Sequence, residues 1–345
     1  MQKQHLFYID VIKVISALAI ILFHLNVHSF YGNNSAKLLG GLSYFNVSFG
    51  DIFISLFIII SGLTLSLIER NKFIISDFFK KRFLAIYPSF WISYIFIAIL
   101  FFLLDKSFGD GQYWKILLSI IGLDGLFLYK FPSYYLVGEW YTGYMLITYL
   151  FFPVLYIMTH KRPILLGVII LTFCVVLHIN YEKLFQMPET INPLMRIPDF
   201  LFGIFFSLYL SKIQLLRNIL FILSIIYLVF SDLLFGLLPY HFHMVIVGVA
   251  IFIILEKIIN LLRVEKVNVV KDIFIYLSKY TFLAFLVHHQ ILLLFFNYIP
   301  NLPNENLIFK FSIFITVSFL SFLYAIIIYP IVIKISVFFK NKLTF

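Results

Sequence analysis

Long apolar runs separated by short polar segments extend along almost the whole chain. A transmembrane helix needs about 20 apolar residues to cross a hydrocarbon core of about 30 Å. Ten runs approach or exceed that length, at 7–30, 45–69, 83–104, 136–158, 163–180, 197–211, 217–238, 242–256, 273–299 and 307–335. The pattern therefore predicts an all-α fold, a polytopic membrane bundle of about ten transmembrane helices.

One further apolar stretch, residues 113–129, is interrupted by Asp124 and Gly125. We interpret it as an interfacial or re-entrant segment, because an eleventh span would reverse the orientation of every later helix. Basic residues support ten spans with both termini in the cytoplasm. The segments that this arrangement places inside hold roughly three times as many Lys and Arg residues as the outer loops.

Composition excludes a soluble protein. The chain of 345 residues is 62% hydrophobic and 12% charged, whereas soluble domains are about 45–50% apolar and about 25% charged. We therefore predict a single transmembrane domain over residues 1–345. The net charge of +10 does not indicate a nucleic-acid partner, because the basic residues lie between the apolar runs. Cys174 is the only cysteine, which excludes a disulfide framework and a thiolate metal site.

Ionisable residues inside an apolar run are functional candidates, because they are expensive to place in a membrane. The first run holds Asp10, Lys13 and His24. Lys13 and His24 are three helical turns apart, so they share one helix face at a separation of about 16–17 Å. Asp10 precedes Lys13 at ion-pair spacing. The imidazole indicates proton transfer, although Lys13 could instead snorkel and His24 could be a hydrogen-bonded core residue.

Other polar positions have two interpretations each. Ser61 precedes Gly62 in the second run, where small residues allow close helix approach. Lys81 and Arg82 precede the third run, as in ordinary cytoplasmic loops, but they could also bind the phosphates of a cytosolic cofactor. The spacing of His24 and His28 could suit a metal pair, but no acidic residue accompanies them, and we predict no metal.

Two later groups are also candidates. Arg196 and Asp199 flank Pro198 at ion-pair spacing, which suits either a structural pair at a helix start or a polar site. His288 and its neighbour His289 lie near the end of the ninth run, where they are either satisfied polar residues or part of a site.

Taken in this order, the motifs resemble the acyltransferase-three family of polytopic membrane acyltransferases. This family usually has arginine at the position of Lys13 and a second arginine at that of Ala85, and some members have glutamate at that of Met145. The matching positions run along nearly the whole chain: Asp10, Lys13, His24, Phe57, Ser61, Gly62, Arg82, Pro88, Trp140, Tyr149, Pro153, Arg196, Asp199, Phe200, Gly203, Thr281, Phe285 and His288.

The resemblance implies a multi-pass protein of the bacterial inner membrane that moves an acyl group from a cytosolic acyl-CoA, such as acetyl-CoA, to a sugar hydroxyl. The acceptor would be a surface polysaccharide, such as capsule or O-antigen, or its lipid-linked precursor. His24 would be the general base or a transient acyl carrier, and Lys13 the second catalytic residue. Lys81 and Arg82 would bind the donor. The remaining residues implied to line the site are Asp10, Ser61, Trp140, Arg196, Asp199 and His288.

Two other functions fit an all-helical membrane protein. A transporter or flippase of lipid-linked glycans would line its path with buried charges, but no internal repeat is visible. A glycan polymerase usually has a large outer loop with arginines, and residues 105–135 contain none.

Overall fold

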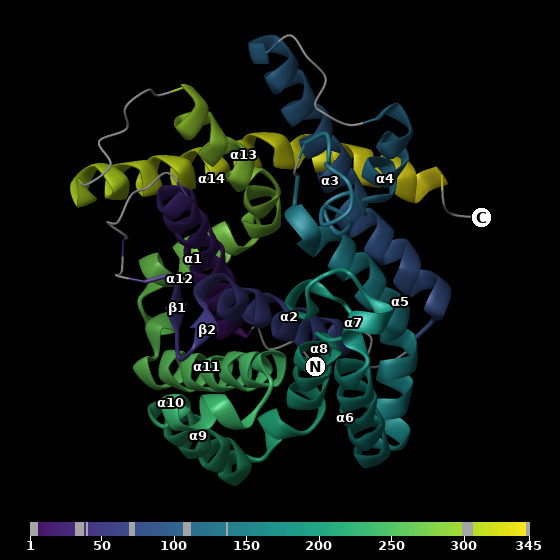
Figure 1. Ribbon diagram of the computed structural model, residues 1–345, viewed down its shortest axis with the longest axis vertical. Coiled ribbons are helices and arrows are strands. Elements are labelled where there is room, and N and C mark those ends of the chain that lie inside the picture. The colour runs from purple at the N-terminus through teal and green to yellow at the C-terminus, as the bar shows by residue number, and fades with distance from the viewer. Residues whose placement is uncertain are drawn as a thin grey trace. The chain divides into compact units, whose positions relative to one another are not determined.

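The computed structural model describes residues 6–31, 38, 41–68, 73–105, 112–135, 137–298 and 306–342. These residues are almost entirely helical, apart from a two-stranded antiparallel ribbon, which confirms the predicted all-α class (Figure 1). The two ends of the chain, residues 1–5 and 343–345, lie outside the described residues. The cytoplasmic location of both termini therefore stays a prediction.

Six of the described helices are long and apolar enough to cross a membrane, and up to eight spans result if each of two broken helix pairs is one span. The predicted count of ten is therefore not confirmed. The run at 163–180 gives a helix of 17 residues, and the run at 197–211 gives one of 12 residues. Twelve helical residues extend only about 18 Å, well short of the hydrocarbon core. The six are α1 (Phe7–Tyr31), α2 (Phe49–Ile68), α3 (Ile75–Asp105), α5 (Glu139–Lys161), α11 (Tyr240–Leu262) and α14 (Leu307–Lys342).

The segment at 113–129 does not span. It forms the short 3-10 helix η2 (Tyr113–Lys115), the six-residue helix α4 (Ile116–Ile121) and a series of turns. Gly122 ends α4 in the left-handed conformation, with φ of 77°. This confirms that the segment is not an eleventh transmembrane helix, since six residues cannot cross the bilayer.

The chain divides into two compact units, each made of three stretches. The first unit comprises Met1–Ile68, Pro198–Thr281 and Pro300–Ser318. Besides α1, α2 and α11 it contains β1 (Ser43–Tyr44), β2 (Val47–Ser48), α8 (Ile197–Leu208), η4 (Leu210–Lys212), α9 (Gln214–Val229), α10 (Ser231–Leu234), η5 (Phe235–Leu237), η6 (Val264–Lys266) and α12 (Asn268–Ser278).

Close backbone packing joins α2 and α8 in the first unit. A Cβ atom on Gly62 would lie 2.1 Å from the Phe200 carbonyl oxygen, and one on Gly203 would lie 2.0 Å from the Ile59 carbonyl oxygen. Only glycine fits at either position. Lipid is as apolar as a protein core, so close packing, rather than hydrophobic burial alone, decides which membrane helices associate. The small residues beside Ser61 therefore allow α2 and α8 to pack closely, as the sequence predicted.

The β1–β2 ribbon of the first unit turns at Phe45 and Asn46, both at positive φ, as a two-residue hairpin requires. His243 of α11 holds this turn, because its Nε2 donates to the Phe45 carbonyl at 2.8 Å. The other ring nitrogen of His243 accepts a hydrogen bond of 2.7 Å from the Tyr227 hydroxyl. This buried histidine is therefore a structural residue with a fixed tautomer.

The second unit comprises Glu69–Ile197, Phe282–Ile299 and Phe319–Phe345. Hydrogen bonds tie α3 to the C-terminal half of α14, from Tyr324 to Ser93 at 3.0 Å and from Ser336 to the Leu84 carbonyl at 3.3 Å. This unit contains α3, η2, α4, α5, α6 (Pro163–Ile179), α7 (Tyr181–Leu184), η3 (Glu189–Ile191), most of α13 (Thr281–Tyr298) and the end of α14.

Candidate functional site

The ionisable residues predicted on the first helix lie on one unbroken helix, α1 of the first unit. Asp10 is buried and accepts a hydrogen bond of 2.5 Å from the Ser278 hydroxyl at the end of α12. Lys13 and His24 are half-buried. The His24 ring packs edge-on against Phe23, with 5.3 Å between the ring centroids. The regular helix places Lys13 and His24 about 16–17 Å apart on one face, as the spacing predicted.

A buried carboxylate begins α8 of the first unit. Asp199 is fully buried in the first turn, where a negative charge is favoured by the helix dipole. A Cβ atom on Gly248 of α11 would lie 3.6 Å from Asp199 Oδ1, in ordinary van der Waals contact with this carboxylate. The same Cβ would lie 2.4 Å from Ser55 Cβ, so glycine is required. The structure thus places Asp199 in a close-packed interior, where a charge must be paired or hydrogen-bonded.

Arg196 is the largest fully buried side chain of the described residues and belongs to the second unit. One of its terminal nitrogens, Nη1, donates to the Thr190 carbonyl at 3.3 Å. A guanidinium is rarely buried unless it is paired. Arg196 is thus fully buried, and its role in a site stays a prediction.

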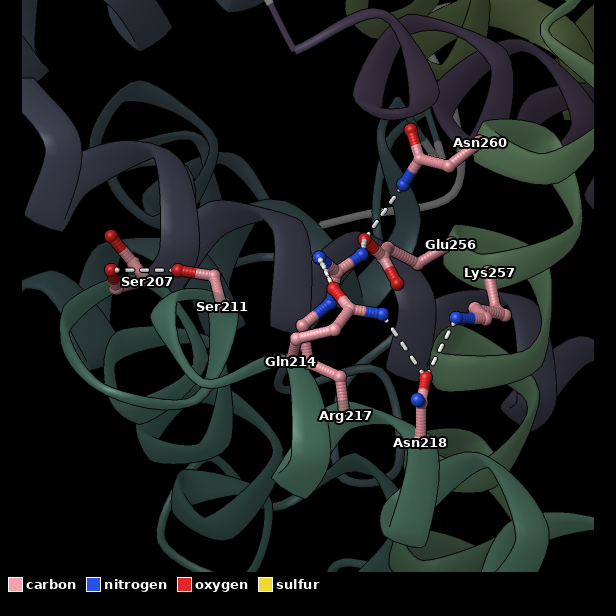
Figure 2. A network of polar contacts seen from close by, with 8 residues as sticks. All are labelled: Ser207, Ser211, Gln214, Arg217, Asn218, Glu256, Lys257 and Asn260. Atoms are coloured by element: carbon pink, nitrogen blue, oxygen red, sulfur yellow. Dashed lines mark hydrogen bonds and ion pairs between the residues drawn. The ribbon is translucent and has the colours of Figure 1, made fainter.

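A polar network that the sequence did not indicate joins α9 and α11 of the first unit (Figure 2). Arg217 forms a short ion pair with Glu256, which is almost fully buried and also accepts a hydrogen bond of 2.7 Å from Asn260. Beside it, Lys257 donates to Asn218 at 2.8 Å. Figure 1 shows α9 and α11 side by side. We interpret the network as a connection between these two helices, because the Arg217–Glu256 and Lys257–Asn218 contacts run from one to the other.

A cavity of about 360 Å³ lies in the second unit between α3, the end of α4 and α5. Arg82 is the one cationic residue among its lining residues. The guanidinium lies near two aromatic rings, 5.8 Å from the centroid of Phe78 and 5.9 Å from that of Tyr149. Its Nε atom is buried and has no hydrogen-bond partner among the described residues. The lining residues are Phe79, Arg82, Phe83, Tyr87, Ile121, Leu123, Leu146, Ile147, Tyr149 and Leu150.

The two basic residues predicted to bind the donor differ in the structure. Arg82 lines the cavity, whereas Lys81 is exposed and does not. The end of α4 closes one side of the cavity. Two side chains of α3 hold it there, because Tyr87 donates to the Ile121 carbonyl at 3.1 Å and Trp91 donates to the Ile120 carbonyl at 2.7 Å. The segment at 113–129 therefore acts as a wall of this cavity.

A buried carboxyl group follows α4 in the second unit. Asp124 accepts hydrogen bonds from the Ser119 hydroxyl at 3.1 Å and from the Gly125 backbone N–H at 2.9 Å. Burial raises the pKa of Asp124 to about 6, and these hydrogen bonds oppose the rise. The Tyr94 hydroxyl of α3 shares a hydrogen bond of 2.8 Å with Ser119. The sequence marked Asp124 only as an interruption of an apolar stretch.

His288 of α13 is fully buried in the second unit and faces Glu139, which the sequence did not indicate as a candidate. Its Nδ1 donates to the Phe285 carbonyl at 2.6 Å, and its Nε2 lies 3.5 Å from Oε1 of Glu139, the first residue of α5. Trp140 follows directly and is half-buried, with edge-on ring contacts to Tyr141 and Tyr144. The missed signal was an acidic residue at the start of an apolar run, directly after a glycine.

Comparison with known proteins gives one match. A family model described as an acyltransferase domain matches residues 6–333, which includes every candidate residue from Asp10 to His288. No curated protein and no solved structure matches the chain.

Proposed function

Because the chain belongs to the acyltransferase-three family, we propose that it moves an acyl group from a cytosolic acyl-CoA to a hydroxyl of a surface polysaccharide or of its lipid-linked precursor. Acetyl-CoA is the simplest donor. The family match covers most of the chain and supports a membrane acyltransferase. The proposal for the donor rests on one observation. The Arg82 guanidinium lines the cavity between α3, α4 and α5.

Arg82 has the properties of an anion ligand in that cavity. Its buried Nε lacks a hydrogen-bond partner among the residues described, and a guanidinium binds phosphate through two parallel hydrogen bonds. Acyl-CoA carries phosphates at one end and a long, less polar arm toward its thioester. The aromatic and aliphatic walls suit that arm. At about 360 Å³ the cavity is at the small end of ligand pockets, so it would enclose part of the donor.

Lys81 and Lys13 would support the donor less directly. Lys81 is exposed one residue before Arg82, where a positive charge attracts an anionic ligand from solution. Lys13 is half-buried on α1 and shares a face with His24. A separation of about 16–17 Å is too long for one contact but suits an elongated donor. Asp10, bonded to Ser278, would fix the start of α1.

His24 would carry the chemistry. As a general base, its imidazole takes the proton of the sugar hydroxyl while the hydroxyl oxygen attacks the thioester carbon. The carbon–sulfur bond then breaks, and the proton passes to the departing CoA sulfur. As an acyl carrier, the imidazole nitrogen itself attacks the thioester and later passes the acyl group to the sugar. Both routes need an imidazole, and both give the same ester and free CoA.

A deletion strain tests this function. We expect nuclear magnetic resonance of its surface polysaccharide to show normal chain length with O-acyl groups missing, and a plasmid copy of the wild-type chain to restore them. A plasmid copy with His24→Ala should fail to restore them. Shortened or absent glycan would instead favour a polymerase or a flippase and would contradict the proposal.

A further inference from the structure

The backbone at the start of α5 is strained at a residue that does not favour the conformation. Glu139 has φ of 47°, in the left-handed region, and it follows Gly138 with φ of 70°. A glutamate rarely adopts this conformation, and such residues persist only where the surrounding structure enforces them, often at functional sites.

Two glycines allow this arrangement. A Cβ atom on Gly138 would lie 2.2 Å from Thr142 Oγ1, and one on Gly125 would lie 2.0 Å from the Glu139 carbonyl oxygen. The Gly138 backbone N–H also donates to the Leu286 carbonyl at 3.0 Å, which ties this turn to α13. The local sequence is therefore adapted to hold Glu139 at one place against α13.

The place is beside His288. The side chain of His288 is 1% exposed and that of Glu139 is 12% exposed. Because a carbonyl oxygen only accepts, the hydrogen bond to Phe285 requires a proton on His288 Nδ1. The nitrogen that faces the Glu139 carboxylate, at 3.5 Å, is then Nε2. The hydrogen bond to the Phe285 carbonyl already fixes the orientation of the His288 ring. The strained backbone at Glu139 is therefore not needed to decide which ring nitrogen faces the carboxylate.

The proton count of the pair follows from electrostatics. A neutral His288 ring with its proton on Nδ1 would direct the Nε2 lone pair at the carboxylate, and two electron-rich atoms repel each other at a buried site. An ion pair between the two side chains therefore requires a second proton on the His288 ring, at Nε2. The separation of 3.5 Å exceeds that of a normal hydrogen bond, about 2.7–3.2 Å, so the contact between Nε2 and the Glu139 carboxylate is an ion-pair contact rather than a short hydrogen bond.

The pair lies on the helix that forms a wall of the Arg82 cavity. Leu146 and Tyr149 line that cavity, and Glu139 precedes them on α5 by about 10 Å and about 15 Å along the helix axis. Leu123, another lining residue, precedes the Asp124–Gly125 turn that packs on the Glu139 backbone. A donor with its phosphates at Arg82 and its arm along α5 would bring its thioester to the level of Glu139.

We propose that His288 acts on the thioester end of the donor and that Glu139 is the positioning residue that keeps the His288 ring protonated at Nε2. This inference rests on the proposed function. The protonated ring stabilises the negative charge that forms on the thioester oxygen during nucleophilic attack on the thioester carbon. The proton stays on the ring through this step, so the pair exchanges no atoms with the substrates.

The second unit contains a matched control. His178 and Glu189 form another histidine–glutamate pair, with 2.8 Å between Nδ1 and Oε1. Their side chains are 34% and 22% exposed, and Glu189 is not among the residues with positive φ. This pair has a shorter contact on an unstrained backbone, so a general effect of losing a histidine–glutamate contact will appear in both pairs.

Acyl transfer by the purified full-length protein in lipid nanodiscs tests the inference. For Glu139→Gln we expect kcat to fall about 10²–10³-fold with KM for acetyl-CoA unchanged, and Glu139→Asp should recover part of the loss. Glu189→Gln should keep the wild-type kcat. The double variant Glu139→Gln with His288→Gln should lose no more than either single variant, since the two residues act as a unit.

A stability measurement separates this role from a purely structural one. Glu139→Gly relieves the left-handed strain, so we expect its melting temperature to equal or exceed that of the wild type while activity is lost. Wild-type kcat in Glu139→Gln, or a loss that follows the melting temperature through all variants, would overturn the inference alone. A wild-type protein that transfers no acyl group would instead overturn the proposed function, and this inference with it.

Discussion

The first and second units present their candidate residues in different ways. In the first unit, Asp10, Lys13 and His24 lie on the regular helix α1, and helical periodicity alone puts Lys13 and His24 on one face. In the second unit, Arg82 reaches its cavity through the packing of α3, α4 and α5, and Glu139 reaches His288 through a strained turn. Helix periodicity alone therefore places the candidate residues of the first unit, whereas tertiary packing brings together those of the second unit.

The difference suggests different duties in the proposed reaction. The imidazole of His24 would perform the chemical step, and the second unit would bind the donor and hold its thioester end. Variants of the two units are then expected to change different kinetic constants. A change in kcat with constant KM belongs to the chemical step, whereas a change in KM with constant kcat belongs to binding.

The largest effect is expected for His24→Ala. Loss of a general base or an acyl carrier should lower kcat about 10²–10⁴-fold and leave KM for acetyl-CoA within about twofold. His160→Ala is the control, because this histidine is exposed at the end of α5. Acyl transfer by the purified variants measures both constants. Wild-type kcat in His24→Ala would contradict the assignment of the chemistry to α1.

A structural effect of the first unit comes next. Gly203→Ala would place a Cβ atom 2.0 Å from the Ile59 carbonyl oxygen, so α2 and α8 must move apart, and we expect a loss of about 1–3 kcal/mol in stability. The matched control is Gly167→Ala in α6, where a Cβ atom meets nothing within 4 Å. Thermal unfolding in detergent compares the two. A Gly203→Ala variant as stable as Gly167→Ala would disprove the close packing.

A smaller effect is expected in donor binding. Arg82→Ala should raise KM for acetyl-CoA about tenfold with little change in kcat, because a phosphate contact to a guanidinium contributes on the order of 1–3 kcal/mol. Arg82→Lys should show a smaller rise in KM, because the lysine keeps the positive charge. Arg162→Ala removes an exposed arginine of the same unit and should behave as wild type. If Arg82→Ala lowers only kcat, the cavity is not the donor site.

The last predicted effect concerns pH. The pKa of Asp124 is raised by burial to about 6, so the folded protein binds this proton more tightly than the unfolded chain. Stability from this group is present at low pH and is lost as pH rises from about 4 through about 6, on the order of 1–3 kcal/mol in total. Melting curves from pH 4 to 8 should show this fall in the wild type. Asp124→Asn should remove it, and an unchanged pH dependence in that variant would refute the assignment.

The sequence predicts α1 well because its residues depend only on local geometry. The predicted run at 7–30 corresponds to the helix Phe7–Tyr31, and its unbroken geometry places Lys13 and His24 on one face, as the spacing predicted. The same holds for α4, where Asp124 and Gly125 correctly indicated that the segment does not span. Helix lengths and faces follow from composition and periodicity, which are properties of the chain alone.

The count of ten spans is not confirmed, because some of the apolar runs form short or broken helices among the described residues. Prolines 88, 153 and 330 lie inside the continuous helices α3, α5 and α14. The run at 217–238 instead breaks after Phe230, with a bend of 76° between α9 and the next helical segment. Membrane helices tolerate proline because neighbouring groups satisfy the freed carbonyls. Composition does not indicate a break at Phe230.

Glu139 and Arg82 show what lies beyond a sequence pattern. The pairing of Glu139 with His288 joins positions far apart in the chain through a left-handed turn, and no periodicity predicts that contact. The sequence selected Arg82 together with Lys81, but only the packing of α4 on α3 separates the lining residue from the exposed one. Long-range packing decides which of the two adjacent charges lines the cavity.

A reconstituted reaction tests acyl transfer to a sugar hydroxyl most directly. Purified wild-type protein in lipid vesicles would receive acetyl-CoA labelled in its acetyl group and a de-O-acetylated polysaccharide from the deletion strain. We predict that the label appears as an O-acetyl ester on the sugar in nuclear magnetic resonance spectra, with one free CoA for each ester formed. Unlabelled polysaccharide with no CoA released would contradict the account.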